Sequence, residues 1–172
     1  MDPGQSLSSA AQGLVAAQQN DLDRALAAVR TKLARKPNDA YLLYLHADFL
    51  AQKGTEPDTP EFQTALQSAK KAVALQPALG DARVVLAKLY MQSGKYEEAA
   101  AECRKALEIN PKDQTAVYRL IQALRKTGKQ KELPDLLKRL AELRKQAARE
   151  EGERNRYRLV EGDSQPANSA QH

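Results

Sequence analysis

Residues 81–111 read DARVVLAKLYMQSGKYEEAAAECRKALEINP and contain two stretches of helical periodicity separated by one glycine. In the first stretch the apolar residues recur at three- and four-residue steps, which places them along one side of a helix. Gly94 follows, and glycine readily takes the left-handed conformation that ends a helix. The second stretch runs from Tyr96 to Ile109 and is closed by Pro111. The segment therefore predicts a helical hairpin.

The same unit recurs along the chain with a nearly constant spacing. Pro77 and Pro111 close successive units and lie 111 − 77 = 34 residues apart. Pro37 precedes Pro77 by 77 − 37 = 40 residues, and the six extra residues fall in the turn 55–60. Gly128 lies 34 residues after Gly94. An insertion confined to a turn leaves the stacking of helical repeats undisturbed, so we expect consecutive, equivalent hairpins.

This pattern resembles the tetratricopeptide repeat, a 34-residue helical hairpin with characteristic residues at fixed offsets. The third unit holds these residues at those offsets: Leu86, Ala87, Tyr90, Gly94, Tyr96, Ala99, Cys103, Ala106 and Pro111. It departs from the family at Arg83, where a tryptophan-like residue is usual, and at Cys103, where an aromatic residue is usual. The resemblance implies an all-α, right-handed α-solenoid of about four hairpins. Composition agrees with an all-α chain, because good helix formers dominate and β-branched and aromatic residues are scarce.

We expect repeats over residues 6–39, 40–79, 80–113 and 114–147, with the insertion 55–60 in the second. The fourth repeat is degenerate, because Leu133 and Leu140 take the offsets where the family has small alanines. Its second helix has no closing proline, and we expect it to continue to about residue 157 as a polar cap. The repeat domain would then cover 6–158, between a flexible N-terminus (1–5) and a disordered tail (159–172).

Bulk composition limits the possible functions. The chain has 172 residues and a net charge of +5. The segment 125–160 holds twelve Lys or Arg and six Asp or Glu, 12 − 6 = +6, so the basic excess is C-terminal. The single cysteine excludes an internal disulfide, and no apolar run approaches the roughly 20 residues of a membrane span. The N-terminus has no secretory signal as written. The compartment stays open between the cytoplasm and, if an upstream signal was removed, an extracytoplasmic space.

The sequence offers no convergent set of catalytic groups. His46 occupies an apolar offset of its predicted helix, where we expect it in the core, and Cys103 is expected to be a small core residue. No His or Cys spacing typical of a metal site and no glycine-rich phosphate loop is found. We therefore predict a protein that is not an enzyme and needs no cofactor or metal.

In proteins that this chain resembles, the first helices of successive repeats line a concave groove that holds a peptide or a partner helix. The groove offsets predict these binding residues: Tyr41, Tyr44, Asp48, Asp81, Val84, Lys88, Met91, Gln92, Thr115, Tyr118, Gln122 and Arg125. Tyrosine suits protein recognition, because its large rigid ring ends in a polar group. Some of these side chains could instead pack between repeats. The Lys and Asn clamp with which some family members bind a C-terminal carboxylate is absent, since those offsets hold Ala10, Leu14, Leu45, Asp81 and Val85.

Our main hypothesis is a protein-interaction module that binds a peptide or helix of an unidentified partner in this groove. One alternative is a self-association scaffold, in which leucines of the C-terminal helix such as Leu136 and Leu140 pack against another chain. A second alternative is that the basic C-terminal helix binds nucleic acid or a membrane surface. Acidic residues interleave with the basic ones at helical spacing, as in a solvated, salt-bridged face, which makes this alternative the least favoured.

Overall fold

Helices account for all the regular secondary structure in the part of the chain that the structure describes, residues 21–162. The structure is a computed structural model. After a helix over residues 21–35, the chain forms α2 (Ala40–Gln52), α3 (Pro60–Leu75), α4 (Gly80–Gln92), α5 (Tyr96–Ile109), α6 (Gln114–Thr127), the short 3-10 helix η1 (Gln130–Glu132) and α7 (Leu133–Gly162). The predicted α-solenoid is thus confirmed, and the first helix of the first hairpin lies outside the described residues.

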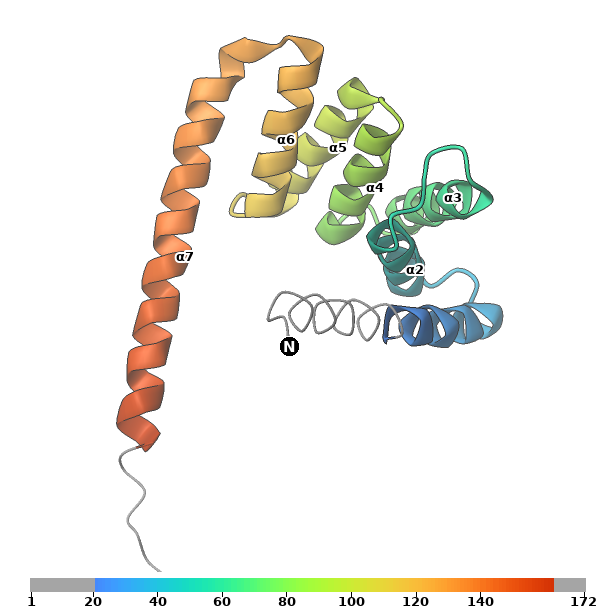
Figure 1. The fold of residues 1–172 in the computed structure, drawn as a ribbon, viewed down its shortest axis with the longest axis horizontal. Coiled ribbons are helices and arrows are strands. Elements are labelled where there is room, and N and C mark those ends of the chain that lie inside the picture. Colours follow the sequence, from blue (N-terminus) through green and yellow to red (C-terminus); the bar gives the residue numbers. More distant parts are fainter. Residues whose placement is uncertain (1–20, 163–172) are drawn as a thin grey trace, which may run out of the picture.

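The helices form antiparallel hairpins that follow one another in a curved row (Figure 1). α2 packs against α3, α4 against α5, and α6 against the first part of α7. Contacts between hairpins run from α2 to α4 and from α4 to α6, and α3 and α5 each also contact the first helix of the next hairpin. Each hairpin therefore covers one side of the next.

Three glycines form equivalent bends within the hairpins. Gly54, Gly94 and Gly128 follow α2, α4 and α6, with φ angles of 75°, 72° and 74°. These are the positive-φ residues of the described chain, and a Cβ placed on any of them would meet no neighbouring atom. Glycine is therefore favoured here by the left-handed backbone, which strains other residues, and not by lack of space.

The hairpins are joined to one another by equivalent proline turns. In each turn the N–H of the fourth residue donates to the carbonyl of the first, at 3.3 Å in 36–39, 3.0 Å in 76–79 and 3.1 Å in 110–113. Proline stands second, where its fixed φ favours a turn. Basic side chains donate to the three proline carbonyls: Lys71 to Pro37, Arg83 to Pro77 and Arg139 to Pro111. Lys71 and Arg139 stand at equivalent positions two periods apart, so the repeat sets these two hydrogen bonds, whereas Arg83 reaches Pro77 from a different position.

Side-chain caps begin three of the helices. Asp39 accepts from the backbone N–H of Leu42 at 3.0 Å, and Asp113 accepts from two N–H groups of α6. Thr59 accepts from the N–H of Phe62 at 3.2 Å, with Pro60 in the first helical position. Such caps stabilise the helix starts, because they satisfy N–H groups that the helix itself cannot.

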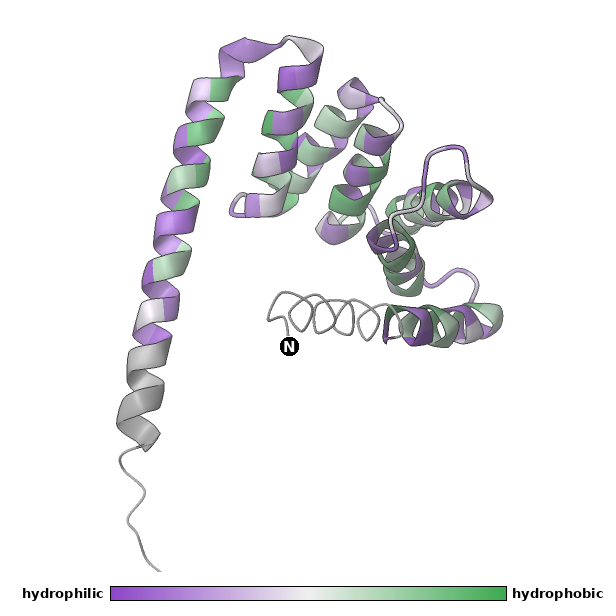
Figure 2. Cartoon of the chain, in the orientation of Figure 1, coloured by the Kyte–Doolittle hydropathy of each residue, from purple (hydrophilic) through white to green (hydrophobic). Residues whose placement is uncertain are grey.

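Apolar side chains form successive core clusters along the row between the helices, and the half-buried Tyr90 packs against two of them (Figure 2). Where neighbouring helices approach each other most closely, the core holds alanines spaced by one period. Ala65 and Ala72 of α3 and their counterparts Ala99 and Ala106 of α5 are all at most 1% exposed. Since alanine adds only a methyl group, the axes of neighbouring helices can approach closely at these positions.

An ion pair is buried in the third hairpin at the offset where the sequence departs from the family. Arg83 donates to Glu102 at 2.7 Å, and the two side chains are 10% and 11% exposed. Glu102 also accepts from Lys105 at 2.9 Å. The equivalent position one repeat later is Val117, which is fully buried. The third hairpin therefore replaces an apolar contact with a hydrogen-bonded charge pair.

The last helix differs from the prediction in its length. α7 continues to Gly162 instead of about residue 157, so residues 159–162 belong to a helix and not to the predicted tail. The segment 153–161 contains no proline and no glycine, so nothing in it interrupts helical geometry. The short helix η1 was not predicted, and Pro134 lies in the first turn of α7 as expected. The predicted flexible N-terminus (1–5) and the rest of the predicted tail lie outside the described residues.

Overpacking tests the close approach at Ala99. Ala99→Leu should lower the free energy of unfolding by about 1–3 kcal/mol, because the added side chain has no space between the helices. Ala101→Leu in the same helix is the control, since Ala101 is exposed and its change should be close to neutral. Urea unfolding of both variants measures the difference, and equal stabilities would show that Ala99 is not at a helix crossing.

Removing one partner of the buried pair should cost more than removing both. Glu102→Ala leaves the Arg83 guanidinium buried without its carboxylate and should destabilise the fold by roughly 3 kcal/mol. The double variant Arg83→Met/Glu102→Leu should recover most of that loss, as apolar replacement of buried pairs often does. Thermal unfolding at constant pH compares them, and a double variant no more stable than Glu102→Ala would contradict this account.

Candidate functional site

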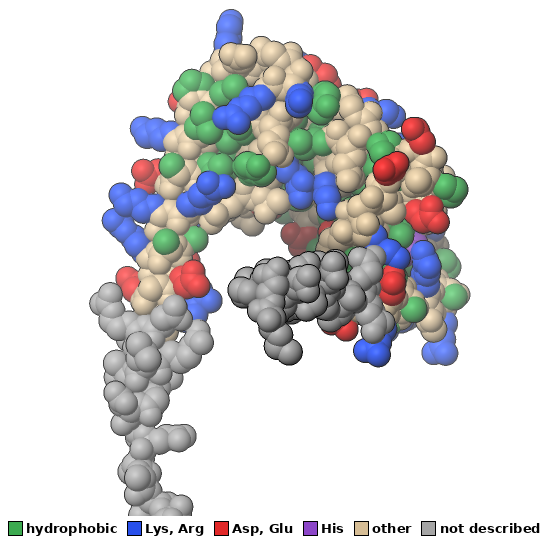
Figure 3. Space-filling model, in the orientation of Figure 1, with side chains coloured by type: hydrophobic (Ala, Val, Ile, Leu, Met, Phe, Trp, Pro, Cys, Tyr) green, Lys and Arg blue, Asp and Glu red, His purple; other side chains and the backbone are tan. Residues whose placement is uncertain are grey.

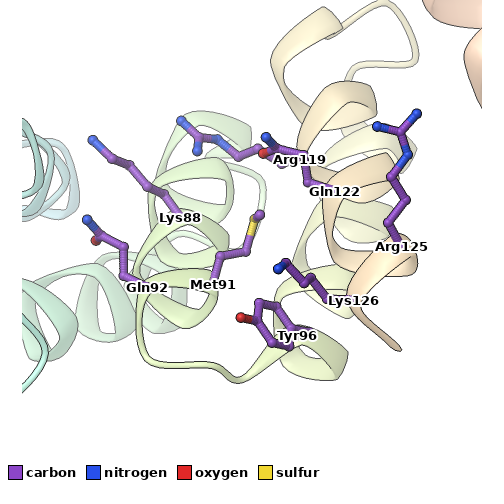
Figure 4. Close-up of a pocket in the computed structure, with 8 residues that line it drawn as sticks. All are labelled: Lys88, Met91, Gln92, Tyr96, Arg119, Gln122, Arg125 and Lys126. Carbon is purple, nitrogen blue, oxygen red and sulfur yellow. The ribbon is translucent and has the colours of Figure 1, made fainter. Parts of the chain in front are cut away.

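A hollow of about 400 Å³ opens between α4 and α6 at the start of α5. Its lining residues are Lys88, Met91, Gln92, Tyr96, Arg119, Gln122, Arg125 and Lys126 (Figure 4). α4 contributes the first three, α5 contributes Tyr96, and α6 contributes the rest. The hollow is therefore built at the junction of the third and fourth hairpins.

The repeat period explains how these side chains come together. Lys88, Met91 and Gln92 of α4 correspond, 34 residues later, to Gln122, Arg125 and Lys126 of α6. Residues three and four positions apart share one face of a helix. Because α4 packs against α6, the two equivalent faces lie next to each other and line one hollow.

The hollow is positively charged. Lys88, Arg119, Arg125 and Lys126 line it, and among the residues that the structure describes no carboxylate does. Figure 3 shows Lys and Arg side chains on the inner side of the curved row, between α4 and α6. The ammonium of Lys88 donates to the backbone carbonyl of Ala51 at 3.0 Å, which holds this side chain across the gap to α2.

Two of these cations are partly dehydrated. Burial, and then the neighbouring Arg119, lower the pKa of Lys88, and burial lowers the pKa of Arg119. The Nε atom of Arg119 is hidden from solvent and has no hydrogen-bond partner among the described residues. The hollow therefore has two adjacent cations with weakened hydration, which favours an arriving anion.

One part of the hollow is apolar. Met91 and Tyr96 are half-buried, so each shows part of its side chain to the hollow. A flexible thioether and an aromatic ring adapt well to apolar groups of different shapes. The hollow can thus accept a charged group and an apolar group side by side.

The structure places five of the predicted groove residues in the hollow: Lys88, Met91, Gln92, Gln122 and Arg125. It adds three that the sequence analysis missed. Lys126 could have been found as the counterpart of Gln92. Arg119 occupies the offset that holds Leu45 and Val85 in earlier repeats, and this change from apolar to basic was the available signal. Tyr96 had been assigned only to packing.

The other predicted groove residues lie outside the hollow. Tyr41 and Tyr118 are exposed by 55% and 45%, and Asp81 and Thr115 are also exposed. Tyr44 is half-buried beside Tyr41, with ring centroids 5.5 Å apart. Burial, followed by Asp48 and Asp81, raises the pKa of Tyr44 to about 12, which places these two carboxylates near its hydroxyl.

Val84 does not lie open on the surface as its groove offset predicted. It is 8% exposed and packs in the core with residues of the third and fourth hairpins. The stacking of α6 on α4 covers this offset, so Val84 contacts other repeats and is not available to a partner.

His46 is held in the interior by two polar neighbours. Arg30 Nε donates to His46 Nε2 at 3.4 Å, and His46 Nδ1 lies 3.0 Å from the hydroxyl of Ser68. Because arginine only donates, Nε2 must accept and the imidazole proton must be on Nδ1, which donates to Ser68. Burial, and then Arg30, lower the pKa of His46. The imidazole is a neutral structural group, in agreement with the expected core position.

Cys103 is completely buried, and burial raises the pKa of its thiol to about 12. A thiol that stays protonated is a poor nucleophile. Among the residues that the structure describes, no three His, Cys, Asp or Glu side chains gather as they would around a metal ion. None of the described helices combines the length and apolar character needed to cross a membrane.

Comparison with protein families agrees with this repeat architecture. Two sequence models, both described as tetratricopeptide repeat, match the chain. One matches residues 61–124 and 92–151, and the other matches residues 10–58. A comparison with curated proteins finds none that matches.

Several solved structures share the fold. A MamA RS-1 double mutant is 20% identical, with a TM-score of 0.65 over 78% of this chain and 72% of that one. MamA AMB-1 is 17% identical, with a TM-score of 0.62 over 77% and 75% of the two chains. A further crystal structure of MamA is 20% identical, with a TM-score of 0.50 over 87% of this chain and 98% of that chain. At these identities the likeness concerns the fold alone.

The lowered pKa of His46 predicts a pH dependence of stability. In the unfolded chain the imidazole titrates near its usual value of about 6.5, so below that pH the unfolded state binds more protons than the folded state. The free energy of unfolding should therefore be highest above about pH 6.5 and should fall as the pH is lowered toward about 5. His46→Leu, which places the residue of the equivalent position Leu86, should lose this part of the dependence. Urea unfolding across that range measures both proteins, and identical pH profiles would contradict the assignment.

Proposed function

Because this chain belongs to the tetratricopeptide repeat family, we propose that it binds a segment of a partner protein along α2, α4 and α6. The family and the fold support a protein-interaction or scaffold module. The observation that carries the finer proposal is the hollow between α4 and α6, which continues the row of exposed polar and aromatic side chains on the first helices.

The composition of this surface suits recognition of a protein. Tyr41 and Tyr118 expose about half of their surface although large aromatic side chains are usually more buried. The hydroxyl of Tyr118 accepts from the Gln122 amide at 3.0 Å, which orients the ring without covering it. Rigid, oriented tyrosines lose little entropy on binding, and interfaces are enriched in them.

Binding also fits the state of the two side chains most suited to catalysis. His46 is held neutral in the interior by Arg30 and Ser68, and the thiol of Cys103 is buried among apolar side chains. Both groups contribute to the packing of the repeats, whereas the side chains of the hollow are free to contact another molecule.

Self-association through α7 is a second candidate function. Leu137 of α7 is 43% exposed, although its neighbours Leu136 and Leu140 are buried against the fourth hairpin. α7 also extends well beyond the other helices (Figure 1). Sedimentation of the wild type and of Leu137→Gln distinguishes the candidates. A concentration-dependent oligomer that Leu137→Gln weakens supports self-association, and a monomer in both cases rules it out.

Substitution of the exposed tyrosines tests the proposed binding surface. Tyr41→Ala/Tyr118→Ala should lose partner proteins captured from a native extract by the wild-type chain, because aromatic contacts often dominate interface energies. Leu75→Ala is the matched control, since Leu75 is also an exposed large apolar residue but lies at the end of α3. Mass spectrometry of the retained proteins, with circular dichroism to confirm folding, measures the effect. Capture of the same proteins by the double variant and the wild type would remove the proposal.

A further inference from the structure

We propose that the hollow between α4 and α6 recognises an acidic side chain of the partner segment, together with an apolar side chain next to it in that segment. This inference rests on the proposed function and names the chemistry of the partner.

Some basic residues of the described chain form ion pairs, but those that line the hollow do not, although Asp48 lies near enough to raise the pKa of Lys88 and Arg119. On the second helices and in the turn before η1, Arg104 pairs with Glu132 and Lys129 pairs with Glu97, at 2.8 and 2.7 Å. Among the described residues, no carboxylate lies within ion-pair distance of the four cations of the hollow, Lys88, Arg119, Arg125 and Lys126. Four like charges in one small site repel each other, and an arriving carboxylate would relieve that repulsion.

Arg119 is the group best placed to recognise a carboxylate. Its guanidinium is partly dehydrated, and because its Nε atom is hidden from solvent, an arriving carboxylate would be bound by the two terminal nitrogens. A guanidinium can donate two parallel hydrogen bonds to the two oxygens of one carboxylate. Such charge-assisted pairs are stronger than hydrogen bonds between neutral groups. The charge of Arg119 lowers the pKa of Lys88, so the two cations lie close enough together to act on one anion.

The shape of the hollow limits what it can hold. A volume of about 400 Å³ is at the lower end for small-molecule sites, and it suits one or two side chains of a longer segment. Met91 and Tyr96 supply an apolar surface beside the charges (Figure 4). The site therefore fits an acidic side chain beside an aliphatic or aromatic one. A protein segment can present these two side chains next to each other.

Protein carboxylates fit better than the phosphates of a nucleic acid. A nucleic acid needs a basic track along its backbone. Here the cations of the hollow lie at the junction of the third and fourth hairpins, and the surface on the side of the second hairpin holds Asp48 of α2 and Asp81 of α4. These carboxylates would repel a phosphate backbone that continued from the hollow toward the second hairpin.

Selection from a library of short random peptides displayed on phage tests the proposal with the full chain as bait. The recovered peptides should carry Asp or Glu beside Leu, Ile, Phe or Tyr, and their binding should weaken as salt is raised. Fluorescence anisotropy with the labelled peptides then measures affinity. Arg119→Gln/Lys126→Gln should weaken binding by about tenfold or more, because it removes charge partners of the acidic side chain. Replacing the acidic residue of the peptide by its amide should do the same.

A variant with the same loss of charge elsewhere is the control. Lys145→Gln/Arg149→Gln changes two exposed residues of α7, outside the hollow, and should leave peptide affinity within about twofold, since distant exposed charges are screened. Circular dichroism and thermal unfolding confirm that each variant is folded. Equal weakening by the α7 and hollow variants would show a general charge effect and would overturn the proposal.

The remaining outcomes separate this inference from the proposed function. The selection could recover neutral or basic peptides whose binding needs Tyr41 and Tyr118 but not Arg119. That result would overturn the proposed recognition of an acidic residue and would still support the proposed binding surface. Failure to recover any peptide that depends on either set of residues would reject both. A single-stranded RNA oligonucleotide that displaces the labelled acidic peptide at equal concentration would overturn the choice of a protein carboxylate in favour of a polyanion.

Discussion

The structure depends on the close approach of helices at small residues that recur once in every repeat. The alanines concerned are at most 1% exposed: Ala65 and Ala72 and, one period later, Ala99 and Ala106. A single hairpin cannot cover its own apolar sides, so each hairpin stabilises the next. Proline turns and glycine bends of equal geometry keep this contact in register along the row. Because the first helices contact one another in sequence, their remaining faces form one continuous surface that the packing itself does not use.

Local sequence signals were sufficient to predict most of this architecture. The spacing of Gly94 and Gly128 predicted their bends, since only glycine adopts a positive φ without strain. The caps at Asp39 and Thr59 are local signals of the same kind, because each lies within three residues of the N–H group that it binds. The Arg83–Glu102 pair could not be predicted, because its partners are 19 residues apart on different helices and each resembles an ordinary charged surface residue. The end of α7 was misplaced because the segment 153–161 contains no proline or glycine, so no residue marks the end of the helix near 157.

The candidate site was only partly accessible from the sequence. Offsets within one helix identified Lys88, Met91 and Gln92, and the period relates them to Gln122 and Arg125. Val84 lies on the same helix but is covered by the next hairpin, which an analysis of single helices cannot detect. Arg119 gains its importance from burial and from an N–H without a partner among the described residues. These are properties of the assembled row, so only the three-dimensional structure reveals them.

Binding of a partner segment along the first helices requires that the stacking of the hairpins leaves one face of α4 and one face of α6 uncovered. Hydrogen–deuterium exchange of the full chain, alone and saturated with a selected peptide, measures this most directly. We predict slower exchange in the peptides that cover Lys88–Gln92 and Arg119–Lys126, with no change in the exposed part of α7 beyond Leu143. Slower exchange confined to α3, α5 or α7, with α4 and α6 unaffected, would contradict the account.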